Sequence, residues 1–377
     1  MSQTKAQLLE GTTAQNVTVD NINTTSVNSG QLSSRNKIIN GAMQVSQRGT
    51  SQAGANSSGY KNAPDRWRFN AGGSNVGTYT VSQSTDSPNG FSNSYKLDVT
   101  STRTPVSDER LDFEQRIEGQ NLQDFAKGTS EAKQYTLSFY VKTDLSGTYV
   151  VALRDEDNDR FVMSTYTVSD GNWNRYTVTF PADTTGAFDN DANHSLAVKF
   201  VVLAGTNFTS GTAQTTWGAE VNANTRVGQT AQLSAASKEW YITGVQLEVG
   251  STATDFEHRP YSHELALCQR YFIRIPDQNA STGYYFLAQG AGHDTNACLI
   301  NMHFPVTMRG NPSMSTLGSL RLYNGGGLTI SSLILNSSSV AGGCLQIAAS
   351  SGISPKDALS LGQNNDSDAA VDFLAEL

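Results

Sequence analysis

Tyr135-Thr-Leu-Ser-Phe-Tyr-Val-Lys142 is the stretch of this sequence that decides the fold class. Its apolar side chains recur at every second position, the spacing that places them on one face of a β-strand. After a short polar break that ends in Gly147, Thr148-Tyr-Val-Val-Ala-Leu153 provides a second apolar run of strand length. We therefore predict two consecutive β-strands in the middle of the chain.

The same signature extends in both directions from this centre. Further strands are predicted at residues 76–83, 95–99, 113–117, 161–168, 173–180, 196–203 and 239–249, separated by Gly, Asn, Asp and Ser. Many short strands in series favour a β-sandwich over alternating strand–helix units. We predict one jelly-roll β-sandwich over residues 35–258.

The composition is typical of an all-β chain. Only 16% of the 377 residues are charged, against roughly 25% in an average soluble domain, and this excludes a coiled coil. The formal net charge is −8 and the basic residues are scattered, so no nucleic-acid partner is expected. No apolar run approaches the roughly 18 residues of a membrane span. The first ten residues lack the apolar core of a signal peptide.

The pattern changes near Pro260. Residues 262–272 (SHELALCQRYF) predict a helix with Ser262 as its N-cap. Strand-like segments follow from residue 271 to the end of the chain, and residues 350–368 have the composition of a long exposed loop. Residues 259–377 are therefore predicted to form a short helix and a second, smaller β domain.

Residues 1–34 differ from the rest because no aromatic residue occurs before Tyr60 and charges are sparse. Such a segment buries too little apolar area to order itself. We predict a short extended N-terminal leader that attaches or oligomerises the protein, and a disordered leader is the alternative. Its candidate assembly contacts are Leu8, Leu9, Val17, Val19, Ile22 and Val27.

The sequence contains no nucleophile elbow, phosphate-binding glycine loop or His-x-x-x-His pair. We therefore expect no enzymatic activity and no cofactor. The three cysteines, Cys268, Cys298 and Cys344, are far apart and predict free thiols. The densest carboxylates are Asp108, Glu109, Asp112 and Glu114; a glycosidase pair among them is the sharper hypothesis and a solvated acidic edge the simpler one.

One acidic segment, residues 155–159 (DEDND), invites a calcium interpretation. Asp155, Asp157 and Asp159 stand at alternate positions, as at the start of an oxygen-rich calcium loop. The sixth position is Arg160 and the twelfth is Tyr166, so the segment is not an EF-hand. A structural calcium ion is one hypothesis, and a polar hairpin turn between two strands is the other.

Glycan binding would use exposed aromatic rings that stack on sugar faces, with polar groups nearby. The candidates lie in loop-like or strand-edge sequence, and they are Tyr166, Phe208, Trp217, Tyr284 and Tyr285. Ordinary packing in the core or at its edge is the alternative for each of them.

Several stretches resemble bacteriophage tail-fibre and related virion proteins. Residues 36–49 (NKIINGAMQVSQRG) with 65–67 (DRW) are similar to the opening of a domain of that family. Residues 240–248 (WYITGVQLE), 253–260 (ATDFEHRP) and 268–272 (CQRYF) resemble its closing half. Residues 135–142 and 173–180 are similar to strands of carbohydrate-binding-module jelly rolls, and 304–312 (FPVTMRGNP) resembles a C-terminal domain that often follows.

This resemblance implies a structural virion protein made in the host cytoplasm, namely a homotrimeric tail fibre or fibre-like appendage for host attachment. Its implied partners are identical copies, other virion proteins through residues 1–34, and a host cell-surface glycan. The alternative is a capsid decoration, head-fibre or tail adaptor protein without receptor binding.

Overall fold

The computed structural model describes residues 26–27, 30–31, 34–74, 77–276, 283–349 and 351–377. Five of the predicted assembly contacts, Leu8, Leu9, Val17, Val19 and Ile22, lie outside these residues. Val27 lies in β1 (Ser26–Val27), which pairs with β2 (Gly30–Gln31). The role of the leader in assembly stays a prediction.

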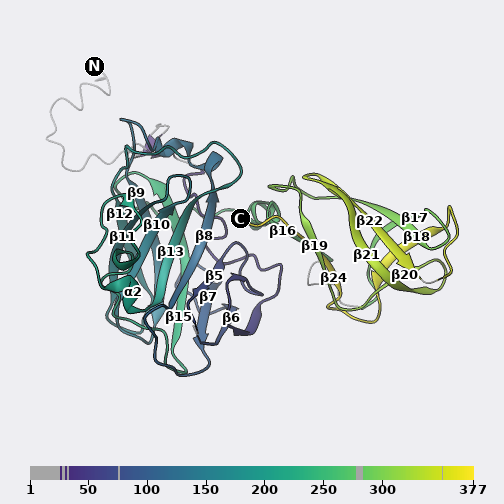
Figure 1. The fold of residues 1–377 in the computed structure, drawn as a ribbon, viewed down its shortest axis with the longest axis horizontal. Helices are drawn as coiled ribbons and strands as arrows, with labels where there is room; N and C mark the ends of the chain where they lie inside the picture. Colours follow the sequence, from purple (N-terminus) through teal and green to yellow (C-terminus); the bar gives the residue numbers. More distant parts are fainter. Residues whose placement is uncertain (1–25, 28–29, 32–33, 75–76, 277–282, 350) are drawn as a thin grey trace, which may run out of the picture.

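The chain is all-β, and two antiparallel sheets form the predicted jelly-roll sandwich (Figure 1). The seven-stranded sheet has the spatial order β14 (Gly218–Ala219), β11 (Arg160–Val168), β10 (Gly147–Asp155), β13 (His194–Ala204), β8 (Arg110–Glu118), β5 (Arg68–Gly72) and β4 (Gly59–Tyr60). The six-stranded sheet has the order β12 (Asn174–Phe180), β9 (Tyr135–Thr143), β15 (Glu239–Val249), β7 (Ser94–Val99), β6 (Tyr79–Ser84) and β3 (Ser51–Ala55).

Aromatic rings from both sheets fill the core between them. Phe139 of β9 meets Phe200 of β13 edge-on, with ring centroids 4.9 Å apart. Trp67 stacks on Phe113 of β8 at 4.6 Å. All four rings are at most 1% exposed, and burial of such side chains is the main stabilising contribution to the fold. The apolar side chains at every second position of β9 thus face the core, as the sequence predicted.

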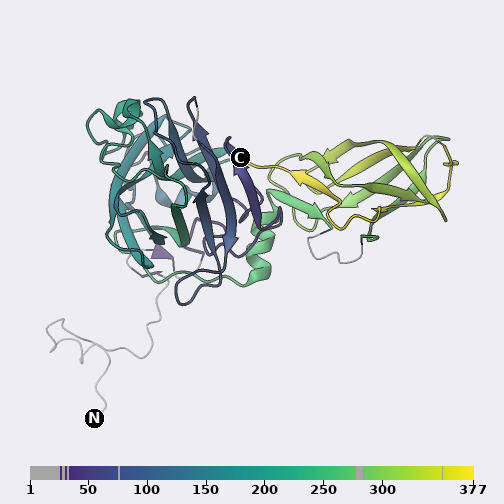
Figure 2. The same cartoon turned by 90° about the horizontal axis from the view of Figure 1, so that it is seen from below.

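Short helices join the strands: η1 (Gly119–Asn121), η2 (Gln123–Phe125), α2 (Thr206–Thr209), η3 (Asn222–Asn224) and α3 (Tyr261–Gln269). The predicted helix near Pro260 is α3, which lies on the side of the sandwich that faces the second domain (Figure 2). It begins one residue early, at Tyr261, and Pro260 is its N-cap without a side-chain hydrogen bond. The prediction that Ser262 caps the helix was therefore wrong.

The second, smaller β domain is a closed barrel with a three-stranded sheet beside it. The barrel order is β17 (Phe286–Gly292), β18 (Ala297–His303), β22 (Gly342–Ala349), β21 (Gly327–Ser339), β20 (Leu320–Tyr323) and β23 (Ala358–Gln363). The small sheet has the order β16 (Phe272–Ile275), β24 (Ala370–Leu374) and β19 (Ser313–Leu317). The predicted loop over residues 350–368 was wrong for β23, because Leu359 and Leu361 are buried in the barrel core.

Among the described residues, no helix is both long and apolar enough to cross a membrane. The division of the chain at residue 258 stays a prediction, since α3 beyond it contacts the sandwich: Glu264 Oε1 accepts a hydrogen bond from the Asn40 amide at 2.5 Å.

Candidate functional site

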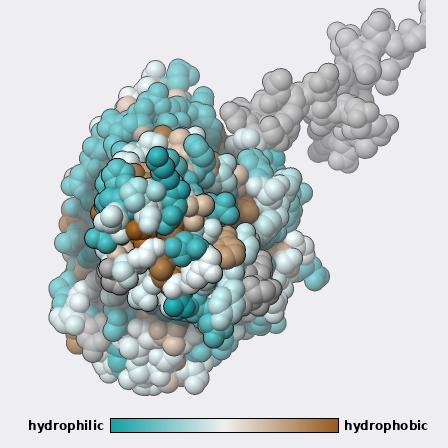
Figure 3. Space-filling model, turned by 90° about the vertical axis from the view of Figure 1, so that its right-hand side faces the viewer, coloured by the Kyte–Doolittle hydropathy of each residue, from teal (hydrophilic) through white to brown (hydrophobic). Residues whose placement is uncertain are grey.

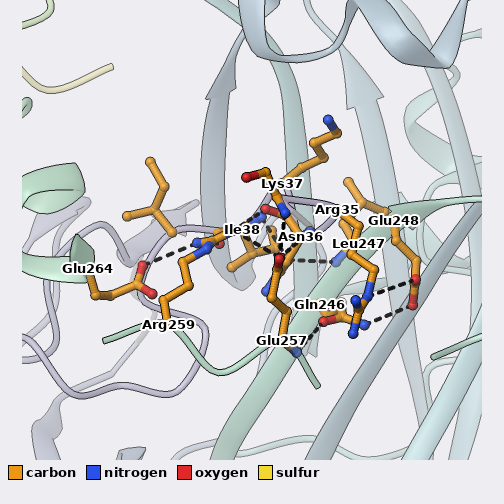
Figure 4. A network of polar contacts seen from close by, with 12 residues as sticks. Arg35, Asn36, Lys37, Ile38, Gln246, Leu247, Glu248, Glu257, Arg259 and Glu264 are labelled. Atoms are coloured by element: carbon orange, nitrogen blue, oxygen red, sulfur yellow. Dashed lines mark hydrogen bonds and ion pairs between the residues drawn. The ribbon is translucent and has the colours of Figure 1, made fainter. Parts of the chain in front are cut away.

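Three of the stretches that carry the family resemblance, residues 36–49, 240–248 and 253–260, meet in one polar network (Figure 4). Asn36 is 5% exposed. Its Nδ2 donates to the Val245 carbonyl at 3.1 Å, and its Oδ1 accepts from the Leu247 amide at 3.1 Å. This side chain supplies hydrogen bonds to the edge of β15 beyond Ile242, where the pairing of β15 with β7 ends.

The segment after β15 closes the same network from the other side. Glu257 Oε2 accepts from the Asn36 amide at 2.9 Å, and the Glu257 amide donates to Gln246 Oε1 at 2.8 Å. Arg259 Nη1 donates to the Ile38 carbonyl at 2.9 Å, and its Nη2 donates to the Asn36 carbonyl. These polar atoms are committed to the protein itself, so the network is framework.

For two of the five residues predicted to bind a glycan, the prediction was wrong, because their rings are buried. Tyr166 is 6% exposed and packs edge-on against Phe139 at 5.0 Å. Phe208 is also 6% exposed. The third, Trp217, is half-buried at the edge of the core: its indole N–H donates to the Pro181 carbonyl at 2.8 Å. These three rings pack in the core or at its edge. Their contacts are with residues distant in the sequence, so the local sequence does not reveal this burial.

The other two predicted rings are open to solvent on the barrel. Among the described residues seven large apolar side chains are exposed, and three of them are consecutive: Tyr284 at 56%, Tyr285 at 51% and Phe286 at 54%. Figure 3 looks onto the molecule from the barrel side and shows hydrophobic patches among polar atoms. We call Tyr284, Tyr285, Phe286 and Tyr323 the aromatic ledge.

A glycine shapes the aromatic ledge. Phe286 lies perpendicular to Tyr323, with ring centroids 5.2 Å apart. Both rings lie over Gly362 of β23, where a Cβ atom would come within 3.0 Å of Phe286 Cδ1 and 3.2 Å of Tyr323 Cε2. Sequence reasoning missed Phe286 and Tyr323, since their strand patterns indicate core positions.

Amide and guanidinium groups border the aromatic ledge. Gln363 pairs with the Tyr285 backbone, donating its amide to the Tyr285 carbonyl at 3.0 Å. The Tyr323 hydroxyl donates to the Gln363 carbonyl at 2.8 Å. Arg321 Nη1 donates to Asn364 Oδ1 at 3.3 Å. Gln363 is fully buried, and its side-chain amide also donates to the Ser367 and Ala369 carbonyls, so it supports the ledge from below. The exposed rings themselves are the groups that can stack on a sugar face.

The predicted calcium ligands have separate partners. Asp155 is fully buried, 2.5 Å from Lys127 Nζ. Asp157 Oδ2 accepts from the Asp189 amide at 2.9 Å, and Asp159 pairs with Arg154 at 3.0 Å. In the part of the chain that the structure describes, no group of three or more His, Cys, Asp or Glu side chains is placed to hold a metal ion. The hairpin β10–β11 turns at this segment.

The prediction that Asp108, Glu109, Asp112 and Glu114 form a solvated acidic edge was wrong for three of these four residues. Asp108 accepts from the Ser74 hydroxyl on the surface, but Glu109, Asp112 and Glu114 are at most 1% exposed. Each of the three pairs with a basic side chain, Arg103, Arg226 and Lys199 respectively. Sequence alone shows the carboxylates but not their partners.

Comparisons with known proteins find structural likenesses at low sequence identity. No protein-family model and no curated protein matches the chain. An enzymatically active domain of tailspike protein 4 of bacteriophage CBA120 is 13% identical over 57% of this chain and 21% of its own, with a TM-score of 0.30. This chain therefore spans about a fifth of that protein.

Carbohydrate-binding modules are matched over most of their own length. A xylan-binding domain of CBM22 is 13% identical over 50% of this chain and 90% of its own, with a TM-score of 0.28. A family 11 module from Clostridium thermocellum, in complex with a β-1,3-1,4-mixed-linked tetrasaccharide, is 9% identical over 56% and 99%, with a TM-score of 0.27.

Proposed function

We propose that this protein is a structural component of a bacteriophage virion, a tail fibre or fibre-like appendage that contacts host surface glycans. The observation that carries glycan contact is the aromatic ledge, with its three consecutive exposed aromatic side chains. The resemblance of residues 36–49, 240–248 and 253–260 to tail-fibre proteins supports the virion assignment. The protein acts by binding and catalyses no reaction.

The glycan contact is tested by binding of the full chain to an array of bacterial surface polysaccharides. The Tyr284→Ala/Tyr285→Ala double variant is compared with Tyr261→Ala, which removes a ring of similar exposure, 57%, on α3. Rings that contribute about 0.5–1.5 kcal/mol each predict a loss of affinity of roughly tenfold in the double variant. Equal binding by the two variants, or no binding of any polysaccharide by the parent chain, contradicts the proposal.

We further propose that the protein assembles as a homotrimer through residues 1–34, which also attach it to other virion proteins. Light scattering after size-exclusion chromatography is expected to give three times the monomer mass of 40.5 kDa. A monomer at micromolar concentration, with residues 1–34 cleaved freely by protease in the assembled particle, argues against this proposal.

The alternative is a decoration, head-fibre or tail adaptor protein without receptor binding. It is favoured by the burial of the residues that carry the family resemblance, since Asn36, Trp67 and Glu248 are at most 5% exposed. A chain that trimerises and binds no host glycan supports this alternative. A turnover assay on the same polysaccharides tests the proposal that the protein is not an enzyme.

A further inference from the structure

A polar groove lies on the seven-stranded sheet, away from the sandwich core. In β8, Leu111, Phe113 and Ile117 belong to the core. Because side chains alternate between the two faces of a strand, Asp112, Glu114 and Arg116 point to the opposite side. The groove on this side has a volume of about 470 Å³. Its basic lining residues are Arg110, Arg116, Arg154, Lys199 and Arg226.

The groove is long enough for an extended chain. Arg110 and Arg116 both line it and are separated by six positions of β8. At about 3.4 Å per strand residue, this separation is ~20 Å. The stretch of β8 under the groove is therefore long enough to lie along a linear molecule of several units.

Buried carboxylates hold most of these cations in place. Glu114 is fully buried and pairs with Lys199 at 2.5 Å and with Arg116 at 3.1 Å. Asp112, also fully buried, accepts two hydrogen bonds from Arg226, at 3.1 and 2.6 Å. The floor of the groove is thus an array of ion pairs, in which the buried carboxylates neutralise the cations above them.

Arg110 is the exception in this array. Among the described residues, no ion pair or hydrogen bond engages its guanidinium group. Its Cζ lies 5.4 Å from the centroid of the Phe208 ring, which Arg226 also approaches at 5.0 Å. The Phe208 ring contacts Arg110 without neutralising it, so the groove presents one positive charge that lacks a counter-ion among the described residues.

Acidic and amide groups occupy the rest of the lining. Glu156, Asp159 and Glu220 line the groove together with Asn70 and Asn222. Arg154 pairs with all three carboxylates and neutralises one of their three negative charges. The remaining negative charge repels a ligand as densely charged as a polyphosphate. Carboxylates and amides do, however, accept and donate hydrogen bonds to hydroxyl groups. The one aromatic residue of the lining, Phe161, is 2% exposed, so recognition here is by hydrogen bonds rather than by stacking.

We propose that this groove binds a segment of a linear acidic polysaccharide. A uronate carboxylate pairs with Arg110, and sugar hydroxyls bond to Asn70, Asn222 and the carboxylates of the lining. The site belongs to the sandwich and does not depend on the aromatic ledge of the barrel, so either site can fail alone.

The test measures binding of the full chain to three linear uronates: oligogalacturonate, an alginate oligosaccharide and hyaluronan. Arg110→Gln is expected to weaken the best of them by about tenfold or more, the effect of one charged hydrogen-bonded contact. Arg175→Gln, the matched loss of one charge on β12 of the other sheet, leaves the affinity unchanged, and so does Tyr285→Ala. Inorganic polyphosphate binds more weakly than the uronate.

The proposal is overturned by any of three results. One is no binding of any of the three uronates at millimolar concentration. Another is equal weakening by Arg110→Gln and Arg175→Gln, and the third is tighter binding of polyphosphate than of uronate. Thermal unfolding of each variant shows that the fold is retained, and Arg110→Lys, which keeps the charge, is expected to fall between the parent and Arg110→Gln.

Discussion

Lys127 shows at the scale of one residue how this low-charge chain uses its ions. Its side chain is fully buried, with Nζ 2.5 Å from Asp155 and 3.1 Å from Asp183. Removal of one partner of a buried ion pair leaves an uncompensated charge, which costs about 3–5 kcal/mol. We expect Lys127→Met to lower the free energy of unfolding by this amount in urea titrations. Lys133→Met, at an exposed position, is the control and should change it by less than about 0.5 kcal/mol.

Glu114 gives the protein a predictable loss of stability in acid. Burial by itself would raise the pKa of Glu114, but Lys199, Arg116 and Arg68 outweigh it and lower the pKa to about 2. A carboxylate with a lowered pKa in the folded state stabilises the fold above its unfolded pKa. That contribution is lost as the pH falls from about 4.5 to about 2. Burial also lowers the pKa of His194 to about 3, which adds to the loss below pH 6.5.

The measurement compares the parent chain with Glu114→Gln by thermal unfolding between pH 7 and pH 2. The variant is expected to have the lower Tm at pH 7, because the cations around Glu114 lose their counter-ion. The difference should shrink as Glu114 of the parent protonates. A Tm difference that stays constant down to pH 2 would show that the Glu114 carboxylate does not titrate as proposed.

Among the elements, β15 is packed closely against the backbone of the segment around Gly41, which precedes the first strand of the sandwich. The Val245 amide donates to the Gly41 carbonyl at 3.0 Å. A Cβ atom at Gly41 would lie 2.2 Å from the Val245 carbonyl oxygen, so the two backbones would have to separate. Gly41→Ala is expected to destabilise the protein by about 1–3 kcal/mol. Gly171→Ala, whose Cβ would meet only the Thr143 carbonyl oxygen at 4.0 Å, should leave Tm nearly unchanged and is the control.

For the whole molecule, the joint between the sandwich and the barrel is built from ion pairs. Near the C-terminus, which lies between the two domains (Figure 1), Glu376 pairs with Arg48 at 2.7 Å and with the buried Arg66. Arg66 also stacks on Tyr271 at 3.4 Å. Arg270, the residue before Tyr271, donates two hydrogen bonds to Glu118 at 2.8 and 2.7 Å. These contacts connect the two ends of the second domain to the sandwich.

We expect Glu376→Gln to loosen this joint. Small-angle X-ray scattering of the variant should give a broader distribution of interatomic distances, and thermal unfolding should separate into two transitions. Glu131→Gln, at an exposed position, is the control and should behave as the parent chain. Unchanged scattering by Glu376→Gln would show that the remaining contacts hold the joint alone.

The sequence by itself determined the all-β class, the sandwich, the helix near Pro260 and the second β domain. These features follow from periodicity along the chain, which is a local property. The tertiary structure decided which aromatic rings are buried and which carboxylates are neutralised. Tyr166 and Tyr285 occur in similar local sequence, and only contacts with distant strands bury the first. Glu114 and Lys199 are 85 positions apart, so their pairing and the groove above them exist only after β8 and β13 lie side by side.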